Sequence, residues 1–522
     1  MKKRIALLLA AVMVLGMAAC GSKTETPATT AAASDAATEA PADTGKVDTS
    51  NMTPEEKAAA EAEIRYAISL LYDRNYIVEE ITQAGQVPAS SFVAMGMTDA
   101  DGSEFYKNAG HNDGFNGYWN VAEDAYEDNF AQAIDILSKY YDYDETTGQF
   151  TNFPTLTYLY NTSDAHKAIG EYLQSALAAV GIPAFGPDKA AARIEASKVF
   201  SKDLMKKYGI PTAKYETFDD PEKVMDYIKA EGKYPVVIKA DGLALGKGVL
   251  ICQNEQEAAD GVKEIMLDKK FGASGNHVVV EEFLTGPEVS VLSFCDGKTV
   301  KPMVSSMDHK RALDHDEGLN TGGMGTVAPN PYYTPAVAER CMQEIFLPTV
   351  AAMQAEGCPF KGCLYFGLML TPDGPKVIEY NCRFGDPETQ VVLPLLESDL
   401  LTVMEATTNG TLDKTDVKFS DGAAACVILA SGGYPLAYEK GKEITGLTAG
   451  QLDAADVTVY HAGTAIKDGR LVTNGGRVLG VTATANTLPE ALKKAYAATE
   501  SIHFDKLHKR SDIGARALAA MQ

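Results

Sequence analysis

The sequence predicts an α/β fold with a helix-rich segment toward its N-terminal end. Four short runs rich in Val and Ile are typical of buried strands. They are residues 234–239, 249–252, 278–284 and 377–380. Two other segments place apolar side chains three or four residues apart, which predicts helices with one buried face. They are residues 64–74 and 169–180.

The first 20 residues have the pattern of an export signal. Three basic residues follow Met1, and residues 5–19 are apolar. This order is typical of a signal peptide, and fifteen apolar residues are too few to span a bilayer comfortably. Residues 17–20 resemble the lipobox of bacterial lipoproteins, although Met17 stands where Leu is usual. We therefore expect Cys20 to be lipidated; the alternative is an ordinary signal peptide with a chance cysteine.

The composition changes along the chain. Residues 21–50 are rich in Ala, Thr, Asp and Pro, which predicts a disordered linker. Residues 1–182 hold 11 basic and 26 acidic side chains, a net charge of −15 out of −24 for the whole chain. Neither part has a basic stripe, which argues against nucleic acid as a partner. Apart from Cys20, every cysteine lies after residue 250 and none forms a C-x-x-C pair, as in a reduced cytosolic domain.

Residues 65–69, 72–78 and 160–169 resemble segments of the oligopeptide-binding proteins of ABC importers. The resemblance implies that residues 51–182 form a partial, α-rich solute-binding-protein domain. Trp119 would either line a peptide cleft or pack in the core, and a packing role is favoured. A complete peptide cleft is not expected from this fragment.

Residues 377–388 combine a strand with polar side chains suited to metal and phosphate. Glu379 and Asn381 stand two residues apart, so both project from the same face of the strand. Carboxylate and carbonyl oxygens are the ligands that Mg²⁺ and Mn²⁺ prefer. Arg383 adds a planar cation suited to carboxylate or phosphate. The alternative is a strand end followed by a charged turn.

A glycine-rich loop at residues 241–248 joins two predicted strands. Such a loop can fold over phosphates with its backbone N–H groups pointing inward. It is not a Walker A loop, because three residues separate Gly242 from Gly246 and Lys247 precedes a glycine. By itself the loop is also compatible with a plain hairpin.

Together with the strand at 278–284 and the later Glu288, these features resemble the ATP-grasp fold. The resemblance implies that the backbone near residues 281–284 holds adenine, that Glu288 holds the ribose, and that Lys198 and Lys239 hold the phosphates. The implied ATP-binding residues are Lys198, Lys239, Gly246, Lys247, Gly248, Glu281, Phe283, Leu284 and Glu288. Glu379 and Asn381 would hold Mg²⁺ or Mn²⁺. Taken singly, Lys198 is equally a helix-surface lysine and Glu288 a turn carboxylate.

Six further motifs resemble phosphoribosylamine–glycine ligase of purine synthesis, and the resemblance runs from about residue 181 to 518. They are residues 307–311, 320–325, 367–369, 381–388, 473–479 and 510–516. The resemblance implies an ATP-grasp domain at 183–415 and a C-terminal α/β domain at 416–522. The implied substrate-binding residues are Asp308, Lys310, Asn320, Thr321, Gly322, Gly323 and Arg477.

The implied chemistry is an ATP-dependent ligation of two small molecules. ATP would phosphorylate glycine to an acyl phosphate, and the amine of 5-phosphoribosylamine would then displace phosphate to give glycinamide ribonucleotide. Arg311 and Arg383 are candidates for gripping the glycine carboxylate and the acyl phosphate. Asp308 or Asp386 would hold the glycine ammonium. The ligase half is expected to be monomeric.

The two resemblances meet at residues 181–187, and the family's glycine-rich N-terminal unit has no counterpart before Pro183. Three interpretations remain open: a ligase, a lipid-anchored peptide-binding component of an importer, and a non-functional chimera. The predicted locations conflict, since the signal implies a membrane-anchored lipoprotein and the ligase family implies the cytoplasm. We expect the chain to form little glycinamide ribonucleotide without that unit.

Overall fold

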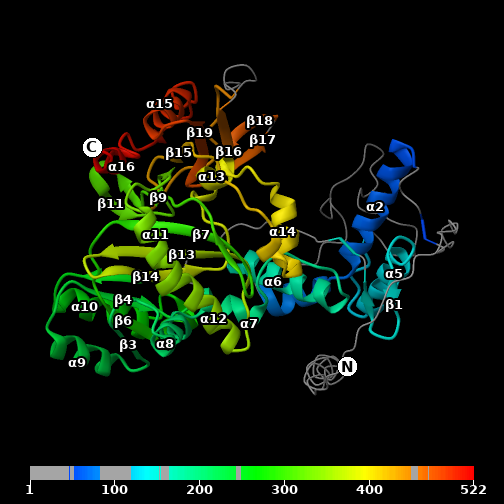
Figure 1. The fold of residues 1–522 in the computed structure, drawn as a ribbon, viewed down its shortest axis with the longest axis horizontal. Coiled ribbons are helices and arrows are strands. Elements are labelled where there is room, and N and C mark those ends of the chain that lie inside the picture. Colours follow the sequence, from blue (N-terminus) through cyan, green and yellow to red (C-terminus); the bar gives the residue numbers. More distant parts are fainter. Residues whose placement is uncertain are drawn as a thin grey trace, which may run out of the picture. The chain divides into compact units, whose positions relative to one another are not determined.

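The computed structural model confirms a mixed helix and sheet protein (Figure 1). It describes residues 46–47, 52–82, 119–151, 153–154, 164–242, 248–447, 456–467 and 469–522. The predicted signal peptide, Cys20 and nearly all of the predicted linker lie outside these residues. Among the helices in the described ranges, none is long and apolar enough to cross a membrane.

The importer-like segment is mainly helical. Its elements are α2 (Pro54–Leu70), α3 (Arg74–Tyr76), the π-helix η2 (Ile77–Thr82), α5 (Tyr126–Leu137), β1 (Tyr143–Asp144), β2 (Gln149–Phe150) and α6 (Asp164–Ala179). Helix α2 begins with a capping box, in which Thr53 and Glu56 bond to each other's backbone N–H groups. The expectation of one helix through residue 74 is wrong. The extended residue Asp73 caps the next helix by accepting bonds from the backbone N–H groups of Asn75 and Tyr76.

This segment has its own apolar core, and Trp119 belongs to it. The indole is 8% exposed and its Nε1–H donates to Ser69 Oγ at 2.8 Å. The guanidinium carbon of Arg74 lies 4.3 Å from the indole centroid, close enough for a cation–π contact. Trp119 therefore packs in the core, as the sequence favoured.

A small antiparallel sheet carries the strands that flank the glycine-rich loop. Its order is β3-β6-β4-β5. The strands are β3 (Tyr215–Phe218), β4 (Val236–Ala240), β5 (Val249–Cys252) and β6 (Val278–Glu282). Helices α9 (Pro221–Glu231) and α10 (Glu255–Val262) lie beside this sheet (Figure 1). The short helices η3 (Lys263–Leu267) and η4 (Gly272–Asn276) follow α10. Three of the predicted strands are thereby confirmed.

A second antiparallel sheet, in the order β14-β13-β7-β8, contains the fourth predicted strand. The strands are β7 (Glu288–Asp296), β8 (Val300–Pro302), β13 (Lys361–Thr371) and β14 (Gly374–Asn381). Side chains of β7 alternate between two apolar clusters, with Val289 and Val291 in one and Leu292 and Phe294 in the other. Helices near this sheet are α7 (Lys189–Ala196), α8 (Lys198–Tyr208), α11 (Pro335–Cys341), η6 (Met342–Phe346), α12 (Leu347–Ala355) and α14 (Leu400–Asn409). A sheet buried on both faces gives the site a rigid base.

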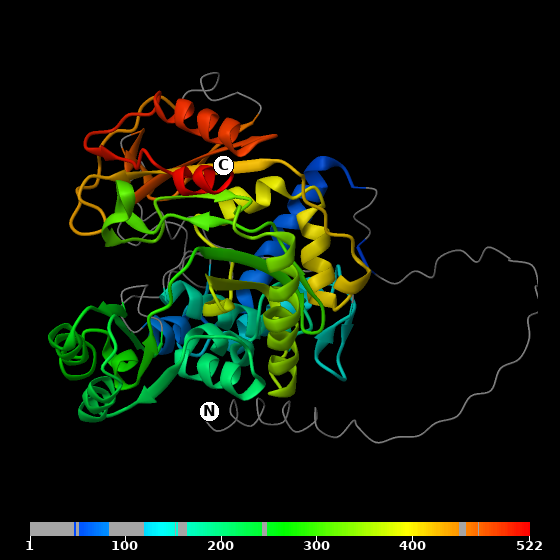
Figure 2. The same ribbon diagram turned by 60° about the vertical axis from the view of Figure 1, so that its left-hand side comes forward.

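The third sheet, in the order β16-β19-β15-β12-β9, joins strands from both sides of the predicted boundary at residue 415. Its strands are β9 (Met307–Asp308), β12 (Gly325–Ala328), β15 (Ala423–Ser431), β16 (Val457–His461), β19 (Arg477–Ala485) and β20 (Leu507–His508), which pairs with β15. In Figure 2 the orange-red helix α15 (Leu488–Thr499) lies over β15 and β19. The C-terminal strands therefore share one sheet with β9, which carries Asp308.

Smaller elements complete the described chain. They are the hairpin β10 (Arg311–Leu313) and β11 (Glu317–Asn320) around η5 (Asp314–Asp316), α13 (Thr389–Val392), η7 (Leu393–Leu395), η8 (Leu412–Lys414), the hairpin β17 (Thr464–Lys467) and β18 (Arg470–Thr473), and α16 (Ala515–Ala520). All seven cysteines after residue 250 are free and buried.

Candidate active site

Two buried lysines share one buried carboxylate in the small sheet and the adjacent helix α8. Lys239 Nζ on β4 lies 3.0 Å from Glu281 Oε1 on β6. Lys202 Nζ on α8 lies 3.1 Å from Glu281 Oε2. Burial lowers the pKa of Lys202 to about 8, against the attraction of Glu281. Two lysines and one glutamate give this cluster a net positive charge, and the ion pairs hold the side chains in place. Such a cluster suits the negative charge of nucleotide phosphates.

Lys198 reaches the start of the same loop from the first turn of α8. Its Nζ donates to Gly242 O at 2.7 Å. Asp241 ties the strand end to the helix, accepting from Ser197 Oγ and from Val199 N, each at 3.1 Å. Lys198 is thus directed toward the loop and not along the helix surface.

The loop itself is described only in part. Gly246 and Lys247 lie outside the described residues. Gly248 O accepts from Ala240 N at 2.8 Å, which closes the two strands on each other. This backbone bond places the ends of the loop close to Lys239, the neighbour of Ala240 on β4.

The predicted metal-binding side chains lie together on β14. Glu379 pairs with Gly367 and Asn381 with Tyr365 across β13, so both side chains project from one face. A Cβ atom on Gly367 would lie 3.2 Å from Glu379 Cγ, so a larger residue here would crowd the Glu379 side chain. Lys239 Nζ donates to Ile378 O at 3.2 Å, joining the lysine cluster to this strand.

The donor chemistry of this strand fits a hard divalent cation. Glu379 and Asn381 supply a carboxylate and an amide oxygen, the ligand types preferred by Mg²⁺. Within the described residues there is no group of three or more His, Cys, Asp or Glu side chains that could hold a metal. Two protein ligands are nevertheless sufficient for a cation that is completed by phosphate oxygens and water.

Arg383 is fixed beside the metal-binding strand. Its Nη2 donates to Asn381 Oδ1 at 3.4 Å and its Nη1 donates to Phe384 O at 3.1 Å. Its Nε lies 3.8 Å from Glu195 Oε1, and Glu195 also accepts from Cys382 N at 2.7 Å. Sequence reasoning missed Glu195, because it lies far along the chain from the motif that it supports.

Glu388 is buried and Asp308 is half-buried, and the charges of the two carboxylates affect each other. Glu388 accepts from Tyr365 Oη at 3.1 Å, and Tyr365 Oη lies 2.7 Å from Ser290 Oγ. Burial raises the pKa of both carboxyl groups, and for Asp308 the charge of Glu388 adds to this effect. Two such groups share a proton more readily than two isolated carboxylates do. Glu388 was not among the predicted site residues, although it ends the motif at 381–388.

Glu288 and Lys310 are each other's partners. Their Oε2 and Nζ atoms lie 2.7 Å apart. The attraction of Lys310 lowers the pKa of Glu288, against the opposing effect of burial. Glu288 follows the segment with Phe283, which is exposed, and Leu284, which is half-buried. The roles predicted for these three residues in nucleotide binding remain predictions.

The predicted substrate-binding residues cluster behind Lys310. Thr321 N and Thr321 Oγ1 both donate to Lys310 O, at 2.7 and 2.8 Å. Gly323 has a φ of +109°, and a Cβ there would lie 2.6 Å from Asp308 Oδ1. Gly322 O accepts from Arg477 Nη1 at 2.7 Å. Asn320 ends β11, and its backbone pairs with Arg311 of β10.

Comparison with known proteins identifies the family. The model of the phosphoribosylglycinamide synthetase ATP-grasp (A) domain matches residues 196–389, and that of the C domain matches residues 424–516. Phosphoribosylamine–glycine ligase of Vibrio vulnificus is 48% identical over 343 residues, covering 66% of this chain and 79% of that protein. The chain belongs to the phosphoribosylamine–glycine ligase family. All the predicted nucleotide, metal and substrate residues lie within these matched ranges.

Other relatives show how far the family likeness extends. A bifunctional purine biosynthetic protein of Pichia angusta is 51% identical over 339 residues, but the chain spans only 42% of that protein. The solved phosphoribosylamine–glycine ligase of Thermotoga maritima is 40% identical, with a TM-score of 0.57 over 63% of this chain and 81% of that one. Biotin carboxylase of Campylobacter jejuni shares the fold, with a TM-score of 0.56 over 74% of this chain and 81% of that one. Its sequence identity to this chain is 14%.

The N-terminal part of this family member matches a different group of proteins. Residues 22–184 match the model of bacterial extracellular solute-binding proteins, family 5 Middle. This match ends close to the start of the ligase-like region, at the junction predicted from the sequence. The chain is therefore a chimera of a ligase region and a binding-protein fragment.

Proposed function

We propose that residues 183–522 catalyse the ATP-dependent joining of glycine to 5-phosphoribosylamine, with Mg²⁺ or Mn²⁺ as the metal. The observation that carries the proposal is the meeting of two sheets at one point. Lys239 of the small sheet donates to Ile378 O, directly before Glu379 of the second sheet. Phosphate-binding cations and metal-binding oxygens are thereby brought together, as phosphoryl transfer from ATP requires.

The first step is the activation of glycine. A carboxylate oxygen of glycine attacks the terminal phosphorus of ATP, and ADP leaves. Lys198 and Lys239 hold the phosphates, while Arg311 and Arg383 orient the carboxylate. A divalent cation bound by Glu379 and Asn381 would offset the charge of the phosphates.

The second step is the attack of an amine on the glycyl phosphate. The amine nitrogen bonds to the carbonyl carbon, phosphate leaves, and the nitrogen gives up a proton. Asp386 is engaged by Arg477 at 2.8 Å, so we assign the glycine ammonium to Asp308. Glu388, which interacts with Asp308, would share the negative charge that attracts the ammonium.

Nucleotide binding tests the first part of this proposal. Isothermal titration of the whole chain with ATP should show binding that is strengthened by Mg²⁺, and Glu379→Ala should lose that metal-dependent part. Glu405→Ala is a matched control, because it removes a carboxylate from helix α14 outside the assigned site. A folded chain with no detectable ATP binding would refute the proposal.

For the N-terminal part we propose export and a lipid anchor on Cys20. The support is the signal-like sequence of residues 1–20 together with the solute-binding match at 22–184. Cells fed a labelled fatty acid should label the chain, and Cys20→Ser should abolish the label. An unlabelled chain in the cytosol would instead favour the ligase role alone.

A further inference from the structure

We infer that Arg510 is a positioning residue for the substrate-binding hairpin β10–β11, and that the C-terminal segment 508–516 acts as a strap over it. The inference rests on the proposed function, in which Lys310 and Arg311 bind substrate. Arg510 is 1% exposed although it carries a full charge. A buried charge is retained only where several partners satisfy it.

The guanidinium of Arg510 joins three separate points. Its Nε and Nη2 donate to the two carboxylate oxygens of Asp512, at 2.7 and 2.8 Å. Its Nη1 donates to Asp316 Oδ1 at 3.0 Å and to the main-chain oxygen of Arg311 at 3.1 Å. One rigid fork therefore fixes both the first strand of the hairpin and its tip.

Neighbouring residues extend the strap along the hairpin. His508 Nε2–H donates to Ala312 O at 2.7 Å. Ser511 N donates to Asp314 Oδ1, and His315 N donates to Asp512 Oδ2, each at 2.8 Å. Because these bonds join positions almost 200 residues apart, they are tertiary contacts and not local turn bonds.

Apart from the buried Ala312, most side chains of the hairpin are exposed or only half-buried. Every residue of β11 is exposed, and Leu313 and Leu319 are 47% and 49% exposed. His315 and Asp316 have φ values of +60° and +56°, a backbone conformation that side chains disfavour. Such a conformation persists where surrounding contacts impose it, and here the contacts come from the strap.

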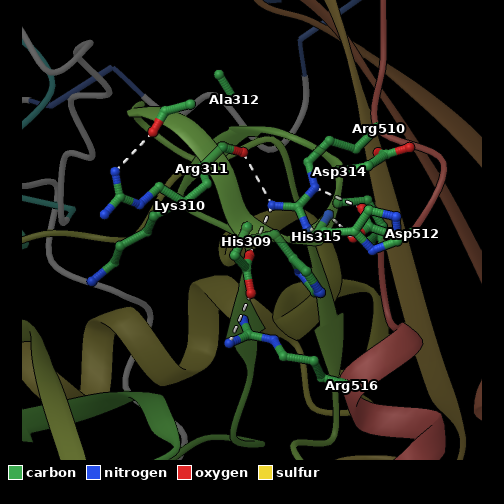
Figure 3. Close-up of polar contacts among 12 residues, drawn as sticks. His309, Lys310, Arg311, Ala312, Asp314, His315, Arg510, Asp512 and Arg516 are labelled. Atoms are coloured by element: carbon green, nitrogen blue, oxygen red, sulfur yellow. Dashed lines mark hydrogen bonds and ion pairs between the residues drawn. The ribbon is translucent and has the colours of Figure 1, made fainter. Parts of the chain in front are cut away.

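Figure 3 shows how this arrangement serves the site. The side chains of Lys310 and Arg311 point away from Arg510, while the Arg311 backbone is bonded to it. On the other side, Lys310 Nζ lies 2.7 Å from Glu288. The strap thus holds the backbone and leaves the two substrate-binding side chains directed away from it.

The test compares variants of the whole chain by hydrogen exchange and by ligand dependence. Arg510→Lys keeps the charge but cannot make all the bonds of the fork. We expect amides of residues 311–320 to exchange at least tenfold faster, and the half-saturating glycine concentration for ADP release to rise at least tenfold. MgATP affinity should stay within twofold, because the lysine cluster is not part of the strap.

Two further variants make the result specific. Asp314→Ala removes the exposed bond to Ser511 and should give a smaller shift of the same kind. Lys509→Met is the matched control, since Lys509 bonds to Thr499 and Glu500 and not to the hairpin. It should leave both readouts unchanged.

Two outcomes would overturn the inference. One is an Arg510→Lys chain with unchanged hairpin exchange. The other is loss of protection throughout β15 and β19, which would make Arg510 a general stabiliser of the fold. If the unsubstituted chain binds MgATP but shows no glycine-dependent ADP release, the proposed function is wrong. Hydrogen exchange of the hairpin amides in the Arg510→Lys chain then still tests whether the strap holds the hairpin.

Discussion

Arg477 and Asp386 form an ion pair, with 2.8 Å between Nη2 and Oδ2, that joins strand β19 to the turn after the metal-binding strand. Arg477 Nη1 also donates to the main-chain oxygens of Asp386 and Gly322, at 2.9 and 2.7 Å. One side chain from the C-terminal region therefore fixes two loops of the candidate site. Both residues were predicted to bind substrate, and in the structure they are bonded to each other.

A double-mutant cycle should reveal this coupling. Arg477→Met removes one donor from two carbonyl oxygens and from Asp386 Oδ2, so we expect it to destabilise the fold by roughly 1–3 kcal/mol. Asp386→Asn alone should cost less, because the backbone bonds remain. Urea unfolding of both single variants and the double variant measures the interaction energy. Strictly additive effects would show that the pair is energetically irrelevant.

The shared carboxylate Glu281 predicts a strong effect at Lys202. Lys202→Met leaves Glu281 with Lys239 as its remaining lysine partner in a buried site, which should cost roughly 3–5 kcal/mol of unfolding free energy. MgATP affinity should also fall, because Lys239 loses its fixed position. Lys206→Met, on the exposed side of the same helix, is the control and should change stability by less than about 0.5 kcal/mol. Equal effects of the two variants would contradict the prediction.

His309 should make stability depend on pH. Its Nδ1–H donates to Gly325 O at 3.1 Å and its Nε2 accepts from Gly514 N at 3.0 Å, so the ring is held neutral. Burial, with the charges of Arg516 and Arg510, lowers the pKa of His309 to about 4 from 6.5. The folded state thus binds fewer protons than the unfolded state between these values. The contribution of His309 to the free energy of unfolding is therefore fully present above pH 6.5. It is lost as the pH falls toward 4, and the loss is roughly 3 kcal/mol.

Urea unfolding at a series of pH values measures this dependence. His309→Gln cannot titrate in this range, so its stability should fall less between pH 7 and pH 4.5 than that of the unsubstituted chain. His503→Gln removes an exposed histidine and serves as the control. A His309→Gln chain with the same pH profile as the unsubstituted chain would exclude His309 as the titrating group.

Complementation tests the complete reaction. Correct orientation of the amine against the acyl phosphate can supply roughly 7–11 kcal/mol of barrier reduction. In this chain the residues before the ligase region match a solute-binding family, and the ligase match covers 79% of the Vibrio vulnificus enzyme. We predict that the chain poorly rescues a purine-requiring strain lacking this ligase, and that the N-terminal unit of a relative, supplied separately, improves rescue. Full rescue by the chain alone would show that the unit is dispensable.

Much of the local structure was predictable from residue patterns. The four strand predictions were correct because runs rich in β-branched residues favour strands; β4 and most of β6 are buried, whereas β5 and β14 are only partly buried. Glu379 and Asn381 were placed correctly on one face, since a two-residue separation on a strand leaves no other choice. The helix expected at 64–74 was wrong at its end, because the local bonds of Asp73 outweighed the apolar spacing.

The sequence alone determined the α/β class, the junction of two families near residue 182, and most of the candidate site. Only the tertiary structure revealed that Lys202 shares Glu281, that Glu388 interacts with Asp308, and that Arg510 holds the backbone of Arg311. The physical reason is distance along the chain. Periodicity reports which face of its own element a side chain occupies, whereas the partner of a buried charge is decided by how separate elements pack.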